Sequence, residues 1–376
     1  MVLVVLATIL VGLMIALPAT AALVRLGERL NTLDSQGHGG HVKELRRIPN
    51  IGGVAIFAAV AIPMAIFLIV VGIFGVDTLA GWVPVLEPYR ERIRENVPAA
   101  TALLACLIAL HSIGLIDDRK ALGPFLKLGV QLATATFMVI AFDVRLLTFL
   151  DRIQPLGPVP SILISILWIT LVTNAINFLD NMDGLAAGVA AISGTLFMAA
   201  ALLYEQWFIA AVLGLMIGGL VGFLRFNFPP ARIFMGDGGS LVIGFLLGVL
   251  TARTTFFDEM HPWRPLSGGW YGVFMPIVVL AVPIYDFTSV TLIRLRQGKS
   301  PFVGDQQHFS HRLVQRGLTR RGAVLVIWAI AATTGIGGIV LGSLAGWQAI
   351  LIGVQTILVL LVLASLEYAS RHAVKA

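Results

Sequence analysis

Residues 159–185 read VPSILISILWITLVTNAINFLDNMDGL, an apolar run that ends in a dense group of polar side chains. Amide and carboxylate groups recur there at every third position, namely at Asn174, Asn177, Asp180 and Asp183. If the run ends as a helix, these side chains share one face and present oxygen atoms of the kind that a hard cation binds. Asn and Asp also cap helix ends, but a cap uses only one side chain. The pattern therefore favours a polar site at the end of an apolar helix.

The composition places the chain among membrane proteins. Hydrophobic residues make up 58% of the 376, charged residues make up 12%, and the mean hydropathy is +0.92, which lies outside the range of soluble domains. Eleven apolar runs are long enough, or nearly so, to cross a hydrocarbon core of ~30 Å. Because helices satisfy their own backbone hydrogen bonds in lipid, we expect an all-α integral membrane protein. The expected spans are 2–23, 51–74, 99–116, 125–142, 159–176, 185–203, 208–224, 241–253, 271–293, 323–341 and 347–366.

The distribution of charge gives the expected orientation. The first run has no positive charge before it and is followed by Arg25 and Arg29, which indicates a retained span with the N-terminus outside. In that orientation 19 of the 26 lysines and arginines fall on the inner side, as the positive-inside rule requires. The C-terminus and the polar site then face the cytoplasm from a multi-pass protein of the inner membrane. No soluble domain or repeat is visible, so we expect residues 1–376 to form a single membrane domain.

Polar groups gather in four segments at the inner ends of spans: 117–127, 174–183, 227–240 and 308–312. Ionisable residues at such positions are costly and therefore indicate function. Carboxylates with an amide could hold Mg²⁺, or Mn²⁺ as an alternative, while phosphate oxygens and water complete the coordination. Basic side chains supply the positive charge that phosphoryl transfer needs. The residues thus predict metal-assisted phosphoryl transfer at the inner membrane surface.

A secondary transporter is the alternative from another class, with the Asp and Asn cluster binding an ion and a substrate. A transporter predicts paired broken spans in two halves and charges near the middle of the bilayer. The charges here collect at one surface, which favours the enzyme. The net charge of +6 needs no nucleic-acid partner, because anionic lipid heads and an anionic substrate account for it. His111 stands alone within a span, and we expect it to hydrogen-bond a neighbouring helix.

Four motifs together resemble a known family over nearly the whole chain. They are the Asp-Asp pair at Asp117, the pattern NAINFLDNMDGL at 174–185, FMGDGGS at 234–240, and HFSHR at 308–312. In this order they are similar to the polyprenyl-phosphate N-acetylhexosamine-1-phosphate transferases, most of all to bacterial undecaprenyl-phosphate N-acetylglucosamine-1-phosphate transferases. The resemblance implies transfer of the sugar phosphate from a UDP-N-acetylhexosamine to undecaprenyl phosphate, with release of UMP. That reaction is the first membrane step of a cell-envelope glycan, such as the O-antigen of lipopolysaccharide. The sequence leaves a homodimer open.

The resemblance also implies roles for individual residues. The metal positions are Asp237 and its partner Asn177. The catalytic positions are Asp117, as the base that deprotonates the lipid phosphate, with Asp118, His308 and His311. The substrate-binding positions are Lys127 for the lipid phosphate, Asp183, Asn227 and Phe234 for uracil, Asp180 beside the diphosphate and sugar, Arg312 in the closing loop, and Arg47 as a loose match to a nucleotide contact.

Two positions depart from the family pattern. Ala121 stands where a third carboxylate often follows the Asp-Asp pair, and Ser310 replaces one histidine of the last motif. The run of three histidines typical of the branch that uses a UDP-muramoyl-pentapeptide is absent. The two aspartates must then suffice, and no role that needs all three histidines is expected.

Overall fold

The structure is a computed structural model that describes residues 1–30, 48–152, 155–254, 270–300 and 307–373. Arg47, expected as a nucleotide contact, lies outside the described residues. Within the described ranges the regular elements are helices, and no β-strand is found. The α-helices are α1 (Val2–Leu30), α2 (Gly53–Trp82), α3 (Arg90–Arg119), α4 (Pro124–Phe142), α5 (Val159–Leu179), α6 (Leu185–Leu203), α7 (Trp207–Asn227), α8 (Asp237–Arg253), α9 (Met275–Val279), α10 (Ala281–Arg296), α11 (Phe309–Gln315), α12 (Arg320–Ile339) and α13 (Gly346–Ala373). Short 3-10 turns occur at Pro84–Tyr89, Thr148–Arg152, Trp270–Phe274 and Leu341–Ser343.

The prediction of an all-helical, multi-pass membrane protein is confirmed. Among the described residues, nine helices are long and apolar enough to cross a membrane, or ten if the bent pair Gly272–Val279 and Ala281–Arg296 counts as one span. The remaining expected span corresponds to α8, which has only 17 residues. The count of eleven and the orientation therefore stay predictions.

The span expected at 271–293 is broken rather than continuous. Its two parts, α9 and α10, meet at an angle of 64°. Pro283 in the first turn of α10 has no N–H with which to bond the carbonyl of Val279, so the helix is interrupted there. The hydroxyl of Ser193 on α6 lies 3.4 Å from that carbonyl and donates to it instead. Hydropathy alone does not show such a break, because both halves are apolar.

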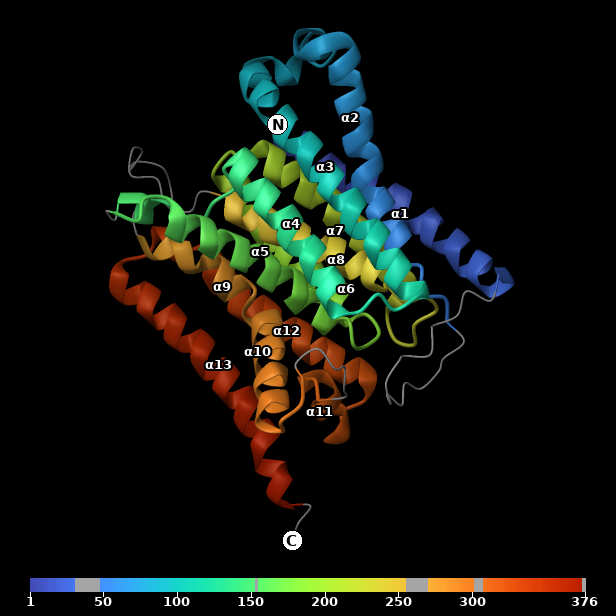
Figure 1. Cartoon of the computed structure of the whole chain (residues 1–376), viewed down its shortest axis with the longest axis vertical. Coiled ribbons are helices and arrows are strands. Elements are labelled where there is room, and N and C mark those ends of the chain that lie inside the picture. Colours follow the sequence, from blue (N-terminus) through green and yellow to red (C-terminus); the bar gives the residue numbers. More distant parts are fainter. Residues whose placement is uncertain (31–47, 153–154, 255–269, 301–306, 374–376) are drawn as a thin grey trace.

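α8 lies in the middle of the bundle (Figure 1), and its residues from Gly238 to Ala252 are buried. Glycines allow other helices to approach it closely. A Cβ on Gly244 would come within 2.7 Å of the Cα of Thr173 on α5, and a Cβ on Gly248 within 3.0 Å of the Cα of Ile169. Such contacts between small residues are the usual way in which membrane helices associate. α8 therefore has a fixed position relative to α5.

Glycines also allow the close contact between α1 and α7. Gly214, Gly218 and Gly222 form a stripe along α7, and a Cβ on any of them would collide with α1. The spacing of four residues places the three glycines on one helix face, as in GxxxG interfaces. α1 is thereby joined to the bundle although little of its surface is buried.

Segment 48–53 is joined to the residues before α8 by backbone hydrogen bonds. The N–H of Phe234 donates to the carbonyl of Pro49 at 2.9 Å, and the N–H groups of Gly52 and Gly53 donate to the carbonyls of Phe234 and Met235, each at 2.9 Å. This pairing fixes the entry into α8 at the end of the bundle where α3 and α5 end and α4 begins.

Candidate active site

Asp237 begins α8, and a carboxylate from α3 holds its backbone in place. Gly236, just before it, has a φ of 69°, a conformation that suits glycine. Asp118 accepts hydrogen bonds from the N–H of Asp237 at 2.9 Å and from the N–H of Gly238 at 3.1 Å. It thus satisfies N–H groups that the first turn of a helix leaves without partners. The amide of Asn50 donates to the same carboxylate at 3.2 Å. Asp118 therefore positions the loop that presents Asp237.

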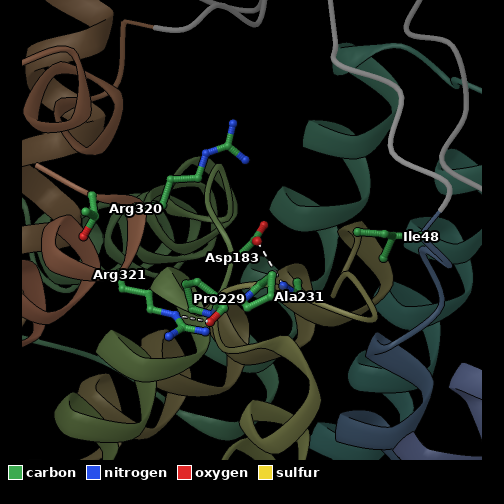
Figure 2. Close-up of a pocket in the computed structure, with 8 residues that line it drawn as sticks. Ile48, Asp183, Pro229, Ala231, Arg320 and Arg321 are labelled. Carbon is green, nitrogen blue, oxygen red and sulfur yellow. Dashed lines mark hydrogen bonds between the residues drawn. The ribbon is translucent and has the colours of Figure 1, made fainter. Parts of the chain in front are cut away.

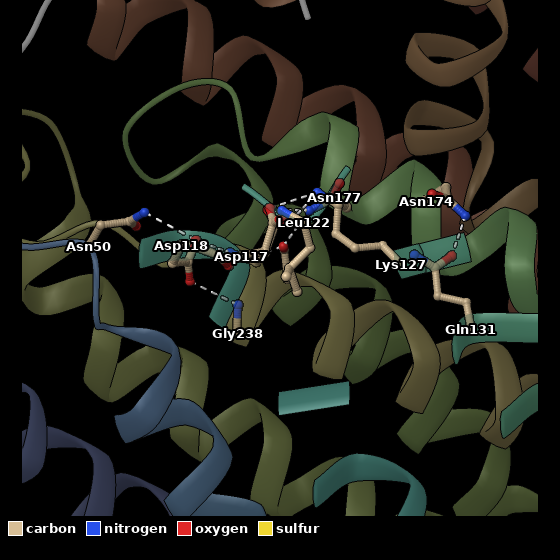
Figure 3. A network of polar contacts seen from close by, with 12 residues as sticks. Asn50, Asp117, Asp118, Leu122, Lys127, Gln131, Asn174, Asn177 and Gly238 are labelled. Atoms are coloured by element: carbon tan, nitrogen blue, oxygen red, sulfur yellow. Dashed lines mark hydrogen bonds and ion pairs between the residues drawn. The ribbon is translucent and has the colours of Figure 1, made fainter. Parts of the chain in front are cut away.

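Lys127 in the first turn of α4 joins two of the expected site carboxylates. Its Nζ lies 2.8 Å from Oδ2 of Asp117 and 2.7 Å from Oδ2 of Asp237. Asp117 also accepts the N–H of Leu122 at 2.8 Å, which fixes the turn between α3 and α4. Figure 3 shows Asp117, Lys127 and Asn177, which come from α3, α4 and α5, in one network of polar contacts. Hydrogen bonds between charged groups are stronger than neutral ones, so one ammonium holds both carboxylates in a single cluster.

Asn177 in the last turn of α5 braces Asp237 from the other side. Its Nδ2 donates to Oδ1 of Asp237 at 2.9 Å and to the hydroxyl of Ser240 at 2.8 Å. Asn174, one turn earlier, donates to Oε1 of Gln131 on α4 at 2.6 Å. The two asparagines thus link α5 to α8 and α4. The expected partnership of Asn177 with Asp237 takes the form of a hydrogen bond here.

The common face expected for all four polar positions does not extend past the end of α5. The helix ends at Leu179, and Asp180 has a ψ of 48°, outside the helical range. Asp183 consequently turns toward the segment after α7, where its Oδ2 accepts the N–H of Ala231 at 3.0 Å. The spacing of three predicted a shared face only as far as Asn177.

A pocket of about 430 Å³ lies beside Asp183. It is lined by Ile48, Asp183, Pro229, Pro230, Ala231, Thr319, Arg320 and Arg321. Figure 2 shows Arg320 and Arg321 on one side of the pocket, Ile48 on the opposite side, and Asp183 between the two sides. Nε of Arg321 donates to the carbonyl of Pro229 at 2.7 Å. The pocket therefore combines a carboxylate with two guanidinium groups, which suits a ligand that carries both N–H donors and phosphate.

Two of the expected uracil contacts lie next to this pocket without lining it. The side chain of Asn227 is 3% exposed; its Oδ1 accepts the N–H of Gly184 at 2.9 Å and its Nδ2 donates to the carbonyl of Ile233 at 2.8 Å. Phe234 is half-buried, and its backbone pairs with segment 48–53. Asn227 therefore joins the turn that follows Asp183 to the loop that precedes α8.

The last motif is held against both α10 and the stretch after α5. His308 precedes α11, and its Nδ1 lies 2.8 Å from Oδ2 of Asp286 on α10. The hydroxyl of Ser310 donates to Oδ1 of Asn181, so the residue that replaces a family histidine anchors α11. The guanidinium of Arg312 donates to the hydroxyl of Ser289 at 3.3 Å. Burial, followed by the charge of His308, lowers the pKa of His311.

Sequence reasoning missed several residues of the site. Asp286 carries a detectable signal, because an acidic residue inside an apolar run is unusual. Asn50, Arg320 and Arg321 carry none, since each stands in an ordinary polar context. The expectation for His111 is confirmed: its Nδ1 lies 2.7 Å from the carbonyl of Gly238 on α8.

The donor set suits Mg²⁺ that binds together with a diphosphate. The part of the chain that the structure describes contains no group of three or more His, Cys, Asp or Glu side chains able to hold a metal ion. Mg²⁺ needs no such group, because it commonly takes one or two carboxylates and completes its shell with substrate phosphates and water. Asp237 offers such a carboxylate: its Oδ1 lies 2.9 Å from Nδ2 of Asn177, the expected partner, and its Oδ2 lies 2.7 Å from Nζ of Lys127.

Comparison with known proteins agrees with this geometry. The profile described as glycosyl transferase family 4 matches residues 100–255. A probable undecaprenyl-phosphate N-acetylglucosaminyl 1-phosphate transferase of Bacillus subtilis is 34% identical over 256 residues, which cover 67% of this chain and 68% of that protein. A decaprenyl-phosphate N-acetylglucosaminephosphotransferase of Mycobacterium tuberculosis is 30% identical over 74% of this chain and 69% of its own length. The undecaprenyl-phosphate alpha-N-acetylglucosaminyl 1-phosphate transferase of Escherichia coli K12 is 30% identical over 63% of this chain and 64% of its own. The chain therefore belongs to the polyprenyl-phosphate N-acetylhexosamine-1-phosphate transferases, described as glycosyl transferase family 4.

Proposed function

We propose that the protein transfers N-acetylglucosamine 1-phosphate, or a related N-acetylhexosamine phosphate, from its UDP-sugar to undecaprenyl phosphate and releases UMP. The observation that carries the proposal is the cluster in which Lys127 joins Asp117 and Asp237. Asp117 and Lys127 lie at the ends of α3 and α4, which are long enough to span a membrane, and Asp237 begins the buried α8. A phosphate on a membrane lipid reaches such a cluster without leaving the bilayer surface. The positive-inside distribution supports a cytoplasmic site in the inner membrane, where UDP-sugars are available.

Lys127 and Asp117 serve the lipid phosphate in this proposal. The ammonium attracts the phosphate, and Oδ2 of Asp117 takes its remaining proton. An oxygen of the lipid phosphate then attacks the β-phosphorus of the UDP-sugar, and the bond between that phosphorus and the oxygen bridging to the α-phosphate breaks. The second pKa of a phosphate monoester lies near 6, so deprotonation adds only modest activation. Positioning and neutralisation of charge supply most of the rate.

The pocket beside Asp183 serves the nucleotide. The carboxylate of Asp183 is an acceptor for the uracil N–H, and Arg320 and Arg321 are donors for the base or the phosphate. Asp237, with Asn177 beside it, would hold Mg²⁺, which when bound neutralises charge on the diphosphate and the departing UMP. Asn177 and Asp118 keep Asp237 in position for this role.

The transporter alternative receives no support from the arrangement of helices. Among the described residues one bent pair is found, α9 with α10, whereas a transporter built from repeats predicts corresponding breaks in both halves. The charged cluster also lies at helix ends.

The direct test uses purified protein, a panel of UDP-N-acetylhexosamines, undecaprenyl phosphate and Mg²⁺. We expect release of UMP together with a lipid diphosphate sugar. Asp237→Ala should abolish turnover at saturating Mg²⁺, because solvent does not replace a ligand that also orients a diphosphate. Asp77→Ala is the matched control, since this carboxylate is 65% exposed and, among the described residues, forms its ion pairs with the exposed Arg90 and Arg94. A folded wild-type protein that releases no UMP from any sugar of the panel would refute the proposed function, and wild-type turnover by Asp237→Ala would refute the metal assignment.

A further inference from the structure

Asp286 is a fully buried carboxylate that the roles described so far leave unused. It lies on α10, inside the broken span, and is 0% exposed. A charge buried in an apolar span is costly unless hydrogen bonds compensate it. Both of its oxygens accept such bonds from one short segment: Oδ2 lies 2.8 Å from Nδ1 of His308, and Oδ1 accepts the N–H of Phe309 at 3.0 Å. The carboxylate is thus directed at the start of α11.

This contact bears on which nitrogen of His308 carries hydrogen. A carboxylate oxygen accepts hydrogen bonds, so this contact favours hydrogen on Nδ1. Nε2 then points away from Asp286. A carboxylate that holds the far nitrogen of a functional imidazole fixes both its tautomer and its ring orientation.

The surroundings of His308 connect it to the central cluster. Its ring meets Phe178 edge-on, with centroids 6.1 Å apart and planes at 76°. Phe178 follows Asn177, whose amide braces Asp237. The ring of Phe178 is in turn covered by the buried guanidinium of Arg294 from α10, 5.3 Å from its centroid. The imidazole is therefore held between α10 and the stretch that carries the site.

We propose that Asp286 is a positioning residue that acts through His308: it holds the imidazole in the Nδ1–H form so that Nε2 serves the sugar diphosphate. The inference rests on the proposed function for its kinetic consequence, although the tautomer itself does not. A competing role is purely structural, in which Asp286 only docks α11 onto α10 through the N–H of Phe309.

Asp286→Asn separates the two roles. The amide keeps one oxygen, which can still accept the N–H of Phe309, and it then places its NH₂ group against Nδ1. The preference for the Nδ1–H form is then lost, and we expect kcat to fall about 100-fold or more, as for loss of a proton-transfer or charge-stabilising group, with KM for the UDP-sugar within about three-fold. Asp286→Glu keeps the charge and should restore part of kcat.

A double-mutant cycle with His308→Gln provides the decisive kinetics. If Asp286 acts through His308, Asp286→Asn should slow the His308→Gln enzyme by less than about three-fold, because the imidazole that Asp286 positions is already absent. Ser193→Ala is the control, since it contacts the break of the same span through the carbonyl of Val279 but not α11; its effect should multiply with that of His308→Gln. Multiplicative effects of Asp286→Asn and His308→Gln would overturn the proposal, as would an unchanged kcat in Asp286→Asn.

A spectroscopic measurement keeps the inference independent of activity. In ¹⁵N-histidine-labelled protein, the resonances of His308 are identified by their loss in His308→Gln. We expect the Nδ1–H form in the wild type and its partial or complete replacement in Asp286→Asn. If the Nδ1–H form is seen in a wild-type protein that releases no UMP, the positioning contact stands and the proposed function fails. If His308 carries its hydrogen on Nε2 alone, the positioning contact is refuted.

Discussion

Gly244→Ala tests the geometry of the active site from a distance. Gly244 lies two helical turns from Asp237 on α8, and Thr173 lies one turn before Asn177 on α5. The added Cβ would stand 2.7 Å from the Cα of Thr173, whereas ordinary contacts begin at 3.4 Å. The two helices must therefore separate locally by about 0.7 Å. The same displacement would lengthen the 2.9 Å bond between Asn177 and Asp237 to about 3.6 Å, beyond the range of a hydrogen bond.

The expected result is a fall in kcat/KM by about ten- to 100-fold, since a misplacement near 1 Å costs up to about 100-fold. Overpacking should also cost about 1–3 kcal/mol of stability. UMP release is measured over a Mg²⁺ titration, with thermal unfolding recorded for each variant. Gly72→Ala on α2 is the control, because a Cβ there meets no atom within 4 Å. If Gly244→Ala matches Gly72→Ala in kcat and in its Mg²⁺ dependence, α5 and α8 do not set the position of Asp237.

Three further predictions follow from the site. Asp117→Asn should lower kcat strongly and leave UDP-sugar affinity within a few-fold, whereas Phe234→Ala should weaken nucleotide binding by ~1–3 kcal/mol, as for a base stacked on an aromatic ring. Calorimetric titration of both variants with the nucleotide measures the two affinities, and equal losses of affinity would contradict the division of roles. Arg320→Ala should raise KM for the UDP-sugar by about ten- to 100-fold through loss of a charged hydrogen bond, whereas Arg316→Ala, which does not line the pocket, should not. Burial lowers the pKa of His311, so the unfolded chain binds more protons than the folded protein and stability should fall as the pH drops through about 6.5. Between pH 7.5 and 5 the unfolding temperature should therefore decline less in His311→Gln than in the wild type, and an equal decline in both proteins would contradict this prediction.

Most of the helices could be predicted because length and apolarity alone decide whether a segment spans a bilayer. The bend between α9 and α10 could not, because Pro283 interrupts the backbone without interrupting the apolar run. For α8, length was the weak criterion, because its 17 residues are fewer than most membrane spans need. Burial among other helices explains how so short a helix is accommodated.

For the site, the family resemblance, rather than spacing, predicted that Asn177 is the partner of Asp237. Spacing could not predict contacts between segments that have no common pattern. Asp286 and His308 stand 22 residues apart, and only the packing of α11 against α10 joins them. The same holds for Asp183 and Arg320, which line one pocket although they stand far apart in the sequence. Position in the fold, rather than residue type, identifies these partners.

The glycine stripe on α7 has a consequence for biogenesis. α1 ends at Leu30, and α7 begins 177 residues later at Trp207, so ribosomes deliver α1 to the bilayer long before the surface that it fits. The interlocking of the two helices cannot form until more than half of the chain has been translated. Insertion and closure of the bundle are therefore separate events in time. A nascent chain stalled before α7 should leave α1 accessible to cross-linking by the insertion machinery, and release of the stall should remove that cross-link.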